Sequence, residues 1–154
     1  MTAPLLVFGW GNMSRGDDAL GPMLVERLRA VSGVGVEFLD DHQLQIEHAL
    51  DLAGRQRVLF VDASLSCRAP FEVTPLRAER DASFTTHAMS PRSLMHVYRD
   101  LHGEEPPPCT LLAIRGERFE LGEPPRSAAL ANLDDALAWA ERWLAGTLPE
   151  AQRA

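Results

Sequence analysis

Short apolar runs alternate with amphipathic segments along the chain, and this alternation constrains the fold more than any other feature. The runs carry apolar residues at consecutive positions, so strands formed from them would be buried on both faces. Strands of that kind are typical of mostly parallel sheets that helices cover on both sides. The runs that predict strands are residues 5–9, 34–39, 58–61 and 110–114, with a weaker edge strand at 71–76.

Between these runs, apolar residues recur at three- and four-residue spacing, which predicts amphipathic helices. The first helix has about ten residues, and Pro22 fits only in its first turn. In the helix expected at residues 44–53, Ile46, Ala49, Leu50 and Ala53 would share the buried face. Two further helices are expected at residues 91–101 and 127–144.

The length of 154 residues fits one domain of this kind and leaves little room for a second. We therefore predict an α/β protein, a single-domain three-layer sandwich. Its mostly parallel twisted sheet would have about five strands, with helices on both faces. We expect the domain to span residues 1–146, and residues 147–154 to form a flexible tail because they have little to pack against.

The charge balance excludes two classes of partner. The chain has 22 Asp and Glu against 15 Lys and Arg, a net charge of -7, and no basic run, so it is a poor binder of nucleic acid or anionic membranes. No apolar stretch approaches the roughly 20 residues of a membrane span, and the N-terminus lacks the basic flank of a signal peptide. The two cysteines, Cys67 and Cys109, have no CxxC spacing. We expect reduced thiols in a cytoplasmic protein, and we favour a monomer.

Carboxylates follow three of the predicted strands at the point where each one ends. Asp17 and Asp18 follow the first strand, Asp40 and Asp41 end the second, and Asp62 closes the third. Open α/β sheets bind ligands in the crevice beyond these strand ends, and a cation would offset the repulsion among unpaired carboxylates there. Each of these aspartates could instead be a helix cap or a turn former.

The five histidines differ in their predicted surroundings. His87 lies in a polar loop before a helix, and loops carry ligand-binding residues more readily than helix faces do. His42 could reach the same crevice, whereas His48, His96 and His102 are expected on the solvated surface. Two carboxylates and one imidazole suit nickel or zinc better than magnesium or copper(I). Such a site leaves positions open, so it could activate a water or recognise a metal that arrives with the substrate.

Two other kinds of site match the sequence less well. Gly9 and Gly11 follow a strand and precede a helix, as in a dinucleotide-binding loop, but the third glycine position is Ser14. Carboxylates at the following helix N-terminus, including Asp18, would also repel a pyrophosphate. A nucleophilic pair between Cys67 and the loop histidine is conceivable but matches no spacing rule.

Three short segments stand in order in the first 100 residues. The first is LLVFGWGN at residues 5–12, followed by GDDALGP at residues 16–22. The second is the strand end Val61-Asp62-Ala63, and the third is TTHAM at residues 85–89, ahead of a helix. Their patterns, GxGN with D-[DE]-x-x-G, a strand ending in Asp, and [ST]-x-H-x-[LM], resemble those of the maturation endopeptidases of nickel–iron hydrogenases.

The resemblance implies a site and a substrate. Asp18, Asp62 and His87 would be the catalytic and metal-contacting residues, and the metal would be nickel supplied by the substrate. That substrate would be the hydrogenase large-subunit precursor with nickel already inserted, from which the enzyme removes a C-terminal extension. Asp17 would be a partner of these residues or a helix cap.

The chain departs from the family pattern at two places. Asp18 stands where many members have Glu, so its carboxylate is retracted by one methylene. Residues 40–43 read DDHQ where many members have Asp-Gly-Gly-Thr, and here the chain resembles the subgroup that serves NAD-reducing hydrogenases. Two alternatives use the same residues: a metal-dependent hydrolase with another substrate, and a non-catalytic nickel-binding maturation chaperone.

Overall fold

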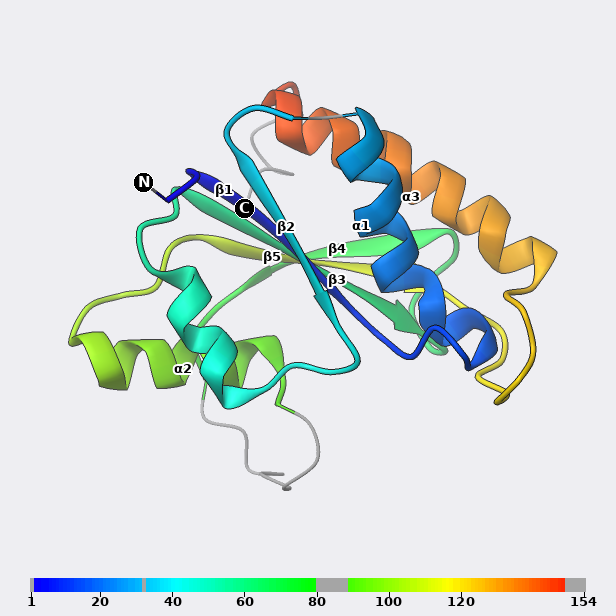
Figure 1. Ribbon diagram of the computed structural model, residues 1–154, viewed down its shortest axis with the longest axis horizontal. Helices are drawn as coiled ribbons and strands as arrows, with labels where there is room; N and C mark the ends of the chain where they lie inside the picture. Colours follow the sequence, from blue (N-terminus) through cyan, green and yellow to red (C-terminus); the bar gives the residue numbers. More distant parts are fainter. Residues whose placement is uncertain (1, 32, 80–88, 149–154) are drawn as a thin grey trace.

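The computed structural model describes residues 2–31, 33–79 and 89–148 and has one sheet of five strands (Figure 1). The strands lie in the order β2-β1-β3-β5-β4, and only the edge strand β4 runs antiparallel to its neighbour. This arrangement confirms the predicted three-layer α/β fold with a mostly parallel sheet. The strands are β1 (Leu5–Trp10), β2 (Val36–Asp41), β3 (Arg57–Ser64), β4 (Phe71–Leu76) and β5 (Cys109–Arg115).

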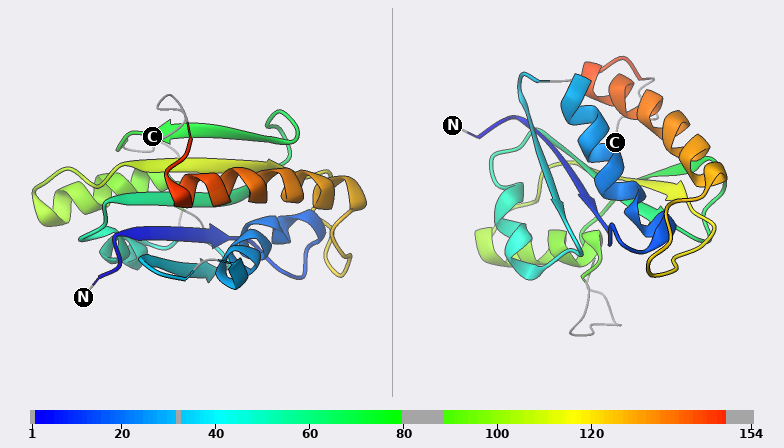
Figure 2. Two further views of the ribbon diagram at one scale, coloured as in Figure 1. Left: turned by 90° about the horizontal axis from the view of Figure 1, so that it is seen from above. Right: turned by 45° about the vertical axis from the view of Figure 1, so that its right-hand side comes forward.

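Helices cover both faces of the sheet (Figures 1 and 2). One face packs against α1 (Leu20–Val31) and α3 (Ser127–Ala145), and the other packs against α2 (Pro91–His102) and the 3-10 helix η2 (Ile46–Leu52). A short 3-10 helix, η1 (Gly16–Ala19), precedes α1. No helix within the described ranges is long and apolar enough to cross a membrane.

Side chains alternate along the central strands between the two faces, and this alternation creates two core clusters. Val7 and Leu59 lie in the cluster beneath α1 and α3, whereas Phe8 and Phe60 lie in the cluster beneath α2 and η2. Leu148 also lies in the first cluster and is 1% exposed. The chain therefore remains packed two residues beyond the domain end expected at residue 146.

The second helix differs from its prediction. It is a 3-10 helix in which Ala49 is buried as expected, and Leu52, which was not placed on the buried face, is buried as well. Ile46 and Leu50, which the α-helical spacing placed on the buried face, are 55% and 63% exposed. The preceding strand also begins two residues later than predicted, because Val34 is fully exposed and the chain enters the sheet only at Val36.

The strand order creates a change of direction between β1 and β3. The chain leaves β1 to form β2 on one side, then crosses back to form β3 on the other side of β1. In sheets of this topology, a crevice opens beyond the carboxyl ends of the two central strands. The structure thus places the loop after β1 and the end of β3 at the position where such folds bind ligands.

Candidate functional site

Asp18 lies in η1, directly after the loop that leaves β1. The loop folds back tightly, because a Cβ on Gly11 would lie 2.0 Å from the backbone oxygen of Asp18, and Gly11 has a φ of +150° that disfavours other residues. The backbone N–H of Asn12 donates a hydrogen bond to Oδ2 of Asp18 at 3.0 Å. The GxGN segment therefore holds the Asp18 carboxylate beside the end of β1.

Asp62 lies in the neighbouring strand β3, at the same end of the sheet. Val61 is paired with Gly9 of β1, so Asp62 comes level with Trp10. By the alternation of the strand it shares a face with Phe60, whose ring centroid is 5.9 Å from that of Trp10. The strand continues to Ser64, so Asp62 lies inside the strand and not at its end as predicted.

The two carboxylates interact electrostatically. The pKa of Asp62 is raised from 3.8 to about 7: burial is the largest cause, the negative charge of Asp18 adds to it, and the backbone N–H of Ala63 opposes both. Near neutral pH, Asp62 is therefore divided between its neutral and ionised forms. A cation near these carboxylates would favour the ionised form.

The two aspartates of the second strand have other partners. Asp40 is exposed and lies 4.0 Å from the guanidinium of Arg29. Asp41 accepts the backbone N–H of His42 at 2.7 Å, and its other oxygen lies 3.3 Å from Nε2 of His48. The structure therefore separates these two residues from the pair formed by Asp18 and Asp62.

His48 is not the solvated surface residue that the sequence predicted. Its side chain is 13% exposed, and its ring packs edge-on against Phe8 at a centroid distance of 4.6 Å. Its Nδ1 atom accepts the backbone N–H of Gln45 and so caps the start of η2. These contacts assign His48 a structural role.

The predicted ligand His87 lies outside the described residues. In the ranges that the structure does describe, no group of three His, Cys, Asp or Glu side chains is arranged to hold a metal ion. The described part of the site thus supplies two carboxylates, Asp18 and Asp62. A third ligand would have to come from residues 80–88 or from a partner.

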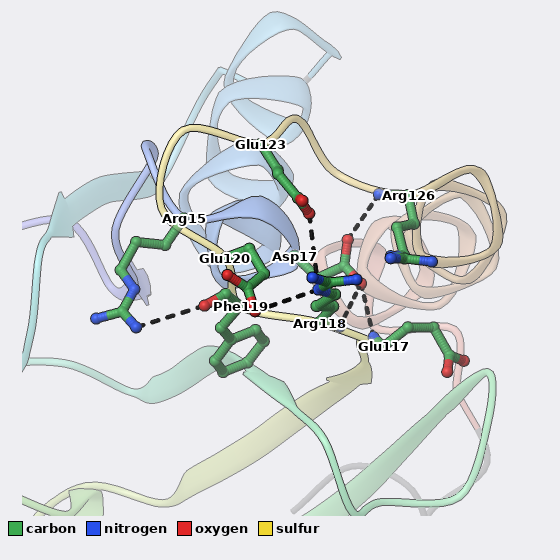
Figure 3. A network of polar contacts seen from close by, with 8 residues as sticks. All are labelled: Arg15, Asp17, Glu117, Arg118, Phe119, Glu120, Glu123 and Arg126. Atoms are coloured by element: carbon green, nitrogen blue, oxygen red, sulfur yellow. Dashed lines mark hydrogen bonds and ion pairs between the residues drawn. The ribbon is translucent and has the colours of Figure 1, made fainter.

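The sequence left Asp17 as a partner of the site residues or a helix cap. The structure buries it fully, and its carboxylate binds the backbone of the connection between β5 and α3 (Figure 3). The sequence did not predict these contacts, because the bonded residues are 100 to 109 positions away. A second residue that the sequence did not single out is Trp10, which is partly buried and which the strand register brings level with Asp62.

The fold and the site together define a class: a small α/β protein in which two carboxylates interact electrostatically at the switch point of a mostly parallel sheet. Comparison with known proteins narrows this class, although no protein-family model matches the chain. Over 123 residues the chain is 33% identical to the hydrogenase 2 maturation protease of Escherichia coli, and the alignment covers 75% of each protein.

Solved structures of similar proteins agree with this match. The hydrogenase maturating endopeptidase HybD from E. coli has a TM-score of 0.71 at 26% identity, covering 92% of this chain and 93% of that one. The nickel–iron hydrogenase maturation protease HycI from Thermococcus kodakarensis has the same TM-score at 22% identity, covers 90% of each chain and shares the fold. The chain belongs to the hydrogenase maturation proteases.

Proposed function

We propose that this protein is an endopeptidase that removes the C-terminal extension from the nickel-loaded large-subunit precursor of a nickel–iron hydrogenase. Family membership supports the reaction class. The observation that carries the proposal is the pair formed by Asp18 and Asp62 at the switch point, where the pKa of Asp62 is raised to about 7. Such a pair favours a cation that arrives with the substrate.

In this proposal, Asp18, Asp62 and His87 contact the nickel of the precursor. Two carboxylate oxygens and one imidazole nitrogen form a donor set that suits nickel. Near neutral pH, Asp62 is protonated in part of the molecules. Approach of the cation stabilises the ionised carboxylate, so that proton is released to solvent. The carboxylate of Asp18 is held in place by the N–H of Asn12 while the precursor docks.

We also propose that the protein acts as a monomer in the cytoplasm and forms a single domain that includes Leu148. The free cysteines Cys67 and Cys109 are both buried, which is consistent with a reducing compartment. Burial of Leu148 in the core cluster supports the extent of the domain. The DDHQ segment at residues 40–43 supports assignment to the subgroup that serves NAD-reducing hydrogenases.

The test is cleavage of a purified large-subunit precursor, followed by intact-mass measurement. The wild-type protein should release one C-terminal peptide from nickel-loaded precursor and none from nickel-free precursor. His87→Ala should lower the cleavage rate at least about 100-fold, since losing even an outer partner of a metal costs about 10- to 100-fold. His96→Ala is the matched control, because that imidazole pairs with Asp100 on α2.

Each outcome has a defined reading. A precursor mass that never changes, while the protein still binds nickel, would reject the peptidase and favour a nickel-binding chaperone. Cleavage of nickel-free precursor at the full rate would show that the reaction does not require nickel. A His87→Ala protein that cleaves as fast as His96→Ala would remove His87 from the site.

A further inference from the structure

The connection between β5 and α3, residues 116–126, closes around the segment that carries Asp18 (Figure 3). The fully buried carboxylate of Asp17 lies at the centre of this contact. Its Oδ2 atom accepts the backbone N–H groups of Glu117 and Arg118 at 2.6 and 3.1 Å, and its Oδ1 atom accepts that of Arg126 at 2.7 Å. Three backbone donors thus satisfy a buried charge that would otherwise be very unfavourable.

The backbones of the two segments also approach closely at two glycines. The N–H of Gly16 donates to the carbonyl of Glu123 at 3.0 Å, and the N–H of Asp17 donates to that of Arg118 at 3.0 Å. A Cβ on Gly16, where φ is +54°, would lie 2.8 Å from the Arg118 oxygen. A Cβ on Gly116 would lie 2.9 Å from Cβ of Asp17. The contact therefore depends on backbone packing as well as on the carboxylate.

The same carboxylate connects this segment to α3, the longest helix. Arg126 is the N-cap of α3, and its own side chain makes no capping hydrogen bond. Asp17 accepts the N–H of Arg126 and places a negative charge at the helix N-terminus, where the helix dipole favours it. Through Asp17, the segment with Asp18 is fixed to an element that packs along the sheet.

We propose that Asp17 is a positioning residue, which anchors η1 to the 116–126 connection and thereby fixes the carboxylate of Asp18 beside Asp62. The inference rests on the proposed role of Asp18 in the site. Asp18 is held by Asn12, a residue of its own loop, whereas Asp17 is held by residues at least 100 positions away. Asp17 and Asp18 are adjacent in η1, so the three contacts of Asp17 also fix the backbone that carries the Asp18 side chain.

The first test needs no substrate. Asp17→Asn keeps the size of the side chain but turns one acceptor oxygen into an NH2 group that faces backbone donors. Hydrogen exchange by NMR then follows the amide of Asn12, which does not bond to Asp17 but reports whether the Asp18 carboxylate is in place. We expect this amide to exchange about tenfold faster than in the wild type, and faster than global unfolding allows.

Leu28→Ala is the matched control for a simple loss of stability, because Leu28 is fully buried toward the far end of α1. In this control the exchange rate of the Asn12 amide should rise only as far as the loss of global stability predicts. If Asp17→Asn fails to fold, Gly116→Ala displaces the same carboxylate by a smaller amount and should act in the same direction. Equal Asn12 exchange in the Asp17→Asn or Gly116→Ala protein and in Leu28→Ala would overturn the proposal.

The second test uses nickel-loaded precursor. Asp17→Asn should lower kcat about 10- to 100-fold and leave KM within about twofold, since a small misplacement near the reacting atoms affects the chemical step. Leu28→Ala should keep the wild-type kcat well below its Tm. An unchanged kcat in Asp17→Asn would contradict the positioning role. Failure of the wild type to cleave any precursor would instead reject the proposed function, while Asn12 exchange would still decide whether Asp17 positions Asp18.

Discussion

Replacing Asp62 by Asn should stabilise the protein while it abolishes cleavage. The pKa of Asp62 is raised from 3.8 to about 7, mainly by burial and secondly by Asp18. Each pKa unit corresponds to about 1.4 kcal/mol, so ionising Asp62 costs about 4 kcal/mol more in the folded state than in the unfolded chain. Asn has nearly the same shape and carries no charge, so it avoids this cost.

The sign of the pH dependence follows from proton binding. Between pH 4 and 7 the folded protein holds a proton on Asp62 that the unfolded chain has released, so wild-type stability falls as the pH rises through this window. The stabilising effect of Asp62→Asn should therefore grow from below about 1 kcal/mol at pH 4 to about 4 kcal/mol above pH 7. For a chain of this size the latter corresponds to a Tm increase of about 10 °C.

Urea unfolding at pH 4 and at pH 8, with a chelator present, measures this difference. Asp40→Asn is the control, because Asp40 is an exposed carboxylate near the end of β2, which β1 separates from β3. Its effect on the free energy of unfolding should be small at both pH values. An equal effect of Asp62→Asn at pH 4 and pH 8 would refute the raised pKa, and a loss of stability at pH 8 would show that the folded protein stabilises the ionised carboxylate.

Two further substitutions test the surroundings of this carboxylate. Asp18→Asn should lower the pKa of Asp62 but leave it above 3.8, because burial is the larger cause of the shift. A carboxyl 13C NMR titration measures this pKa, and a value of 3.8 in the variant would contradict the prediction. Gly11→Ala should destabilise the protein by about 3 kcal/mol or more in urea unfolding, through a positive φ and a Cβ 2.0 Å from a backbone oxygen. Gly103→Ala, with a φ of +66° and open space around it, should cost only about 1 kcal/mol, and equal losses would argue against the close approach at Gly11.

The strands could be predicted because strands buried on both faces leave continuous apolar runs, as in β1 and β3. The helix predicted at residues 44–53 forms over residues 46–52, and its buried face was predicted only in part, because Ala49 is buried as expected but Ile46 and Leu50 are exposed. Its apolar residues fit an α-helical stripe, but the backbone adopts a 3-10 helix that buries Ala49 and Leu52. Spacing alone does not distinguish these helices when the segment is so short.

The site was predicted only in part, for a related reason. The topology of a parallel sheet brings strand ends together, so Asp18 and Asp62 could be expected near one another. The same argument included Asp41, but a strand end does not reveal that His48 and the His42 backbone already bind its carboxylate. The role of Asp17 depends on contacts 100 or more positions away and leaves no local pattern.

The adjacent aspartates of the GDDA segment show how the fold maintains an unfavourable site. Asp17 is buried with three backbone donors, so its charge stabilises the packing around α3. Asp18 places its charge near a second buried carboxylate and raises the pKa of Asp62. Repulsion of this kind tends to separate η1 from β3, and the Asp17 contacts oppose that separation. A cation brought by the substrate would remove the repulsion, and this relief would favour binding of the nickel-loaded precursor over the nickel-free one.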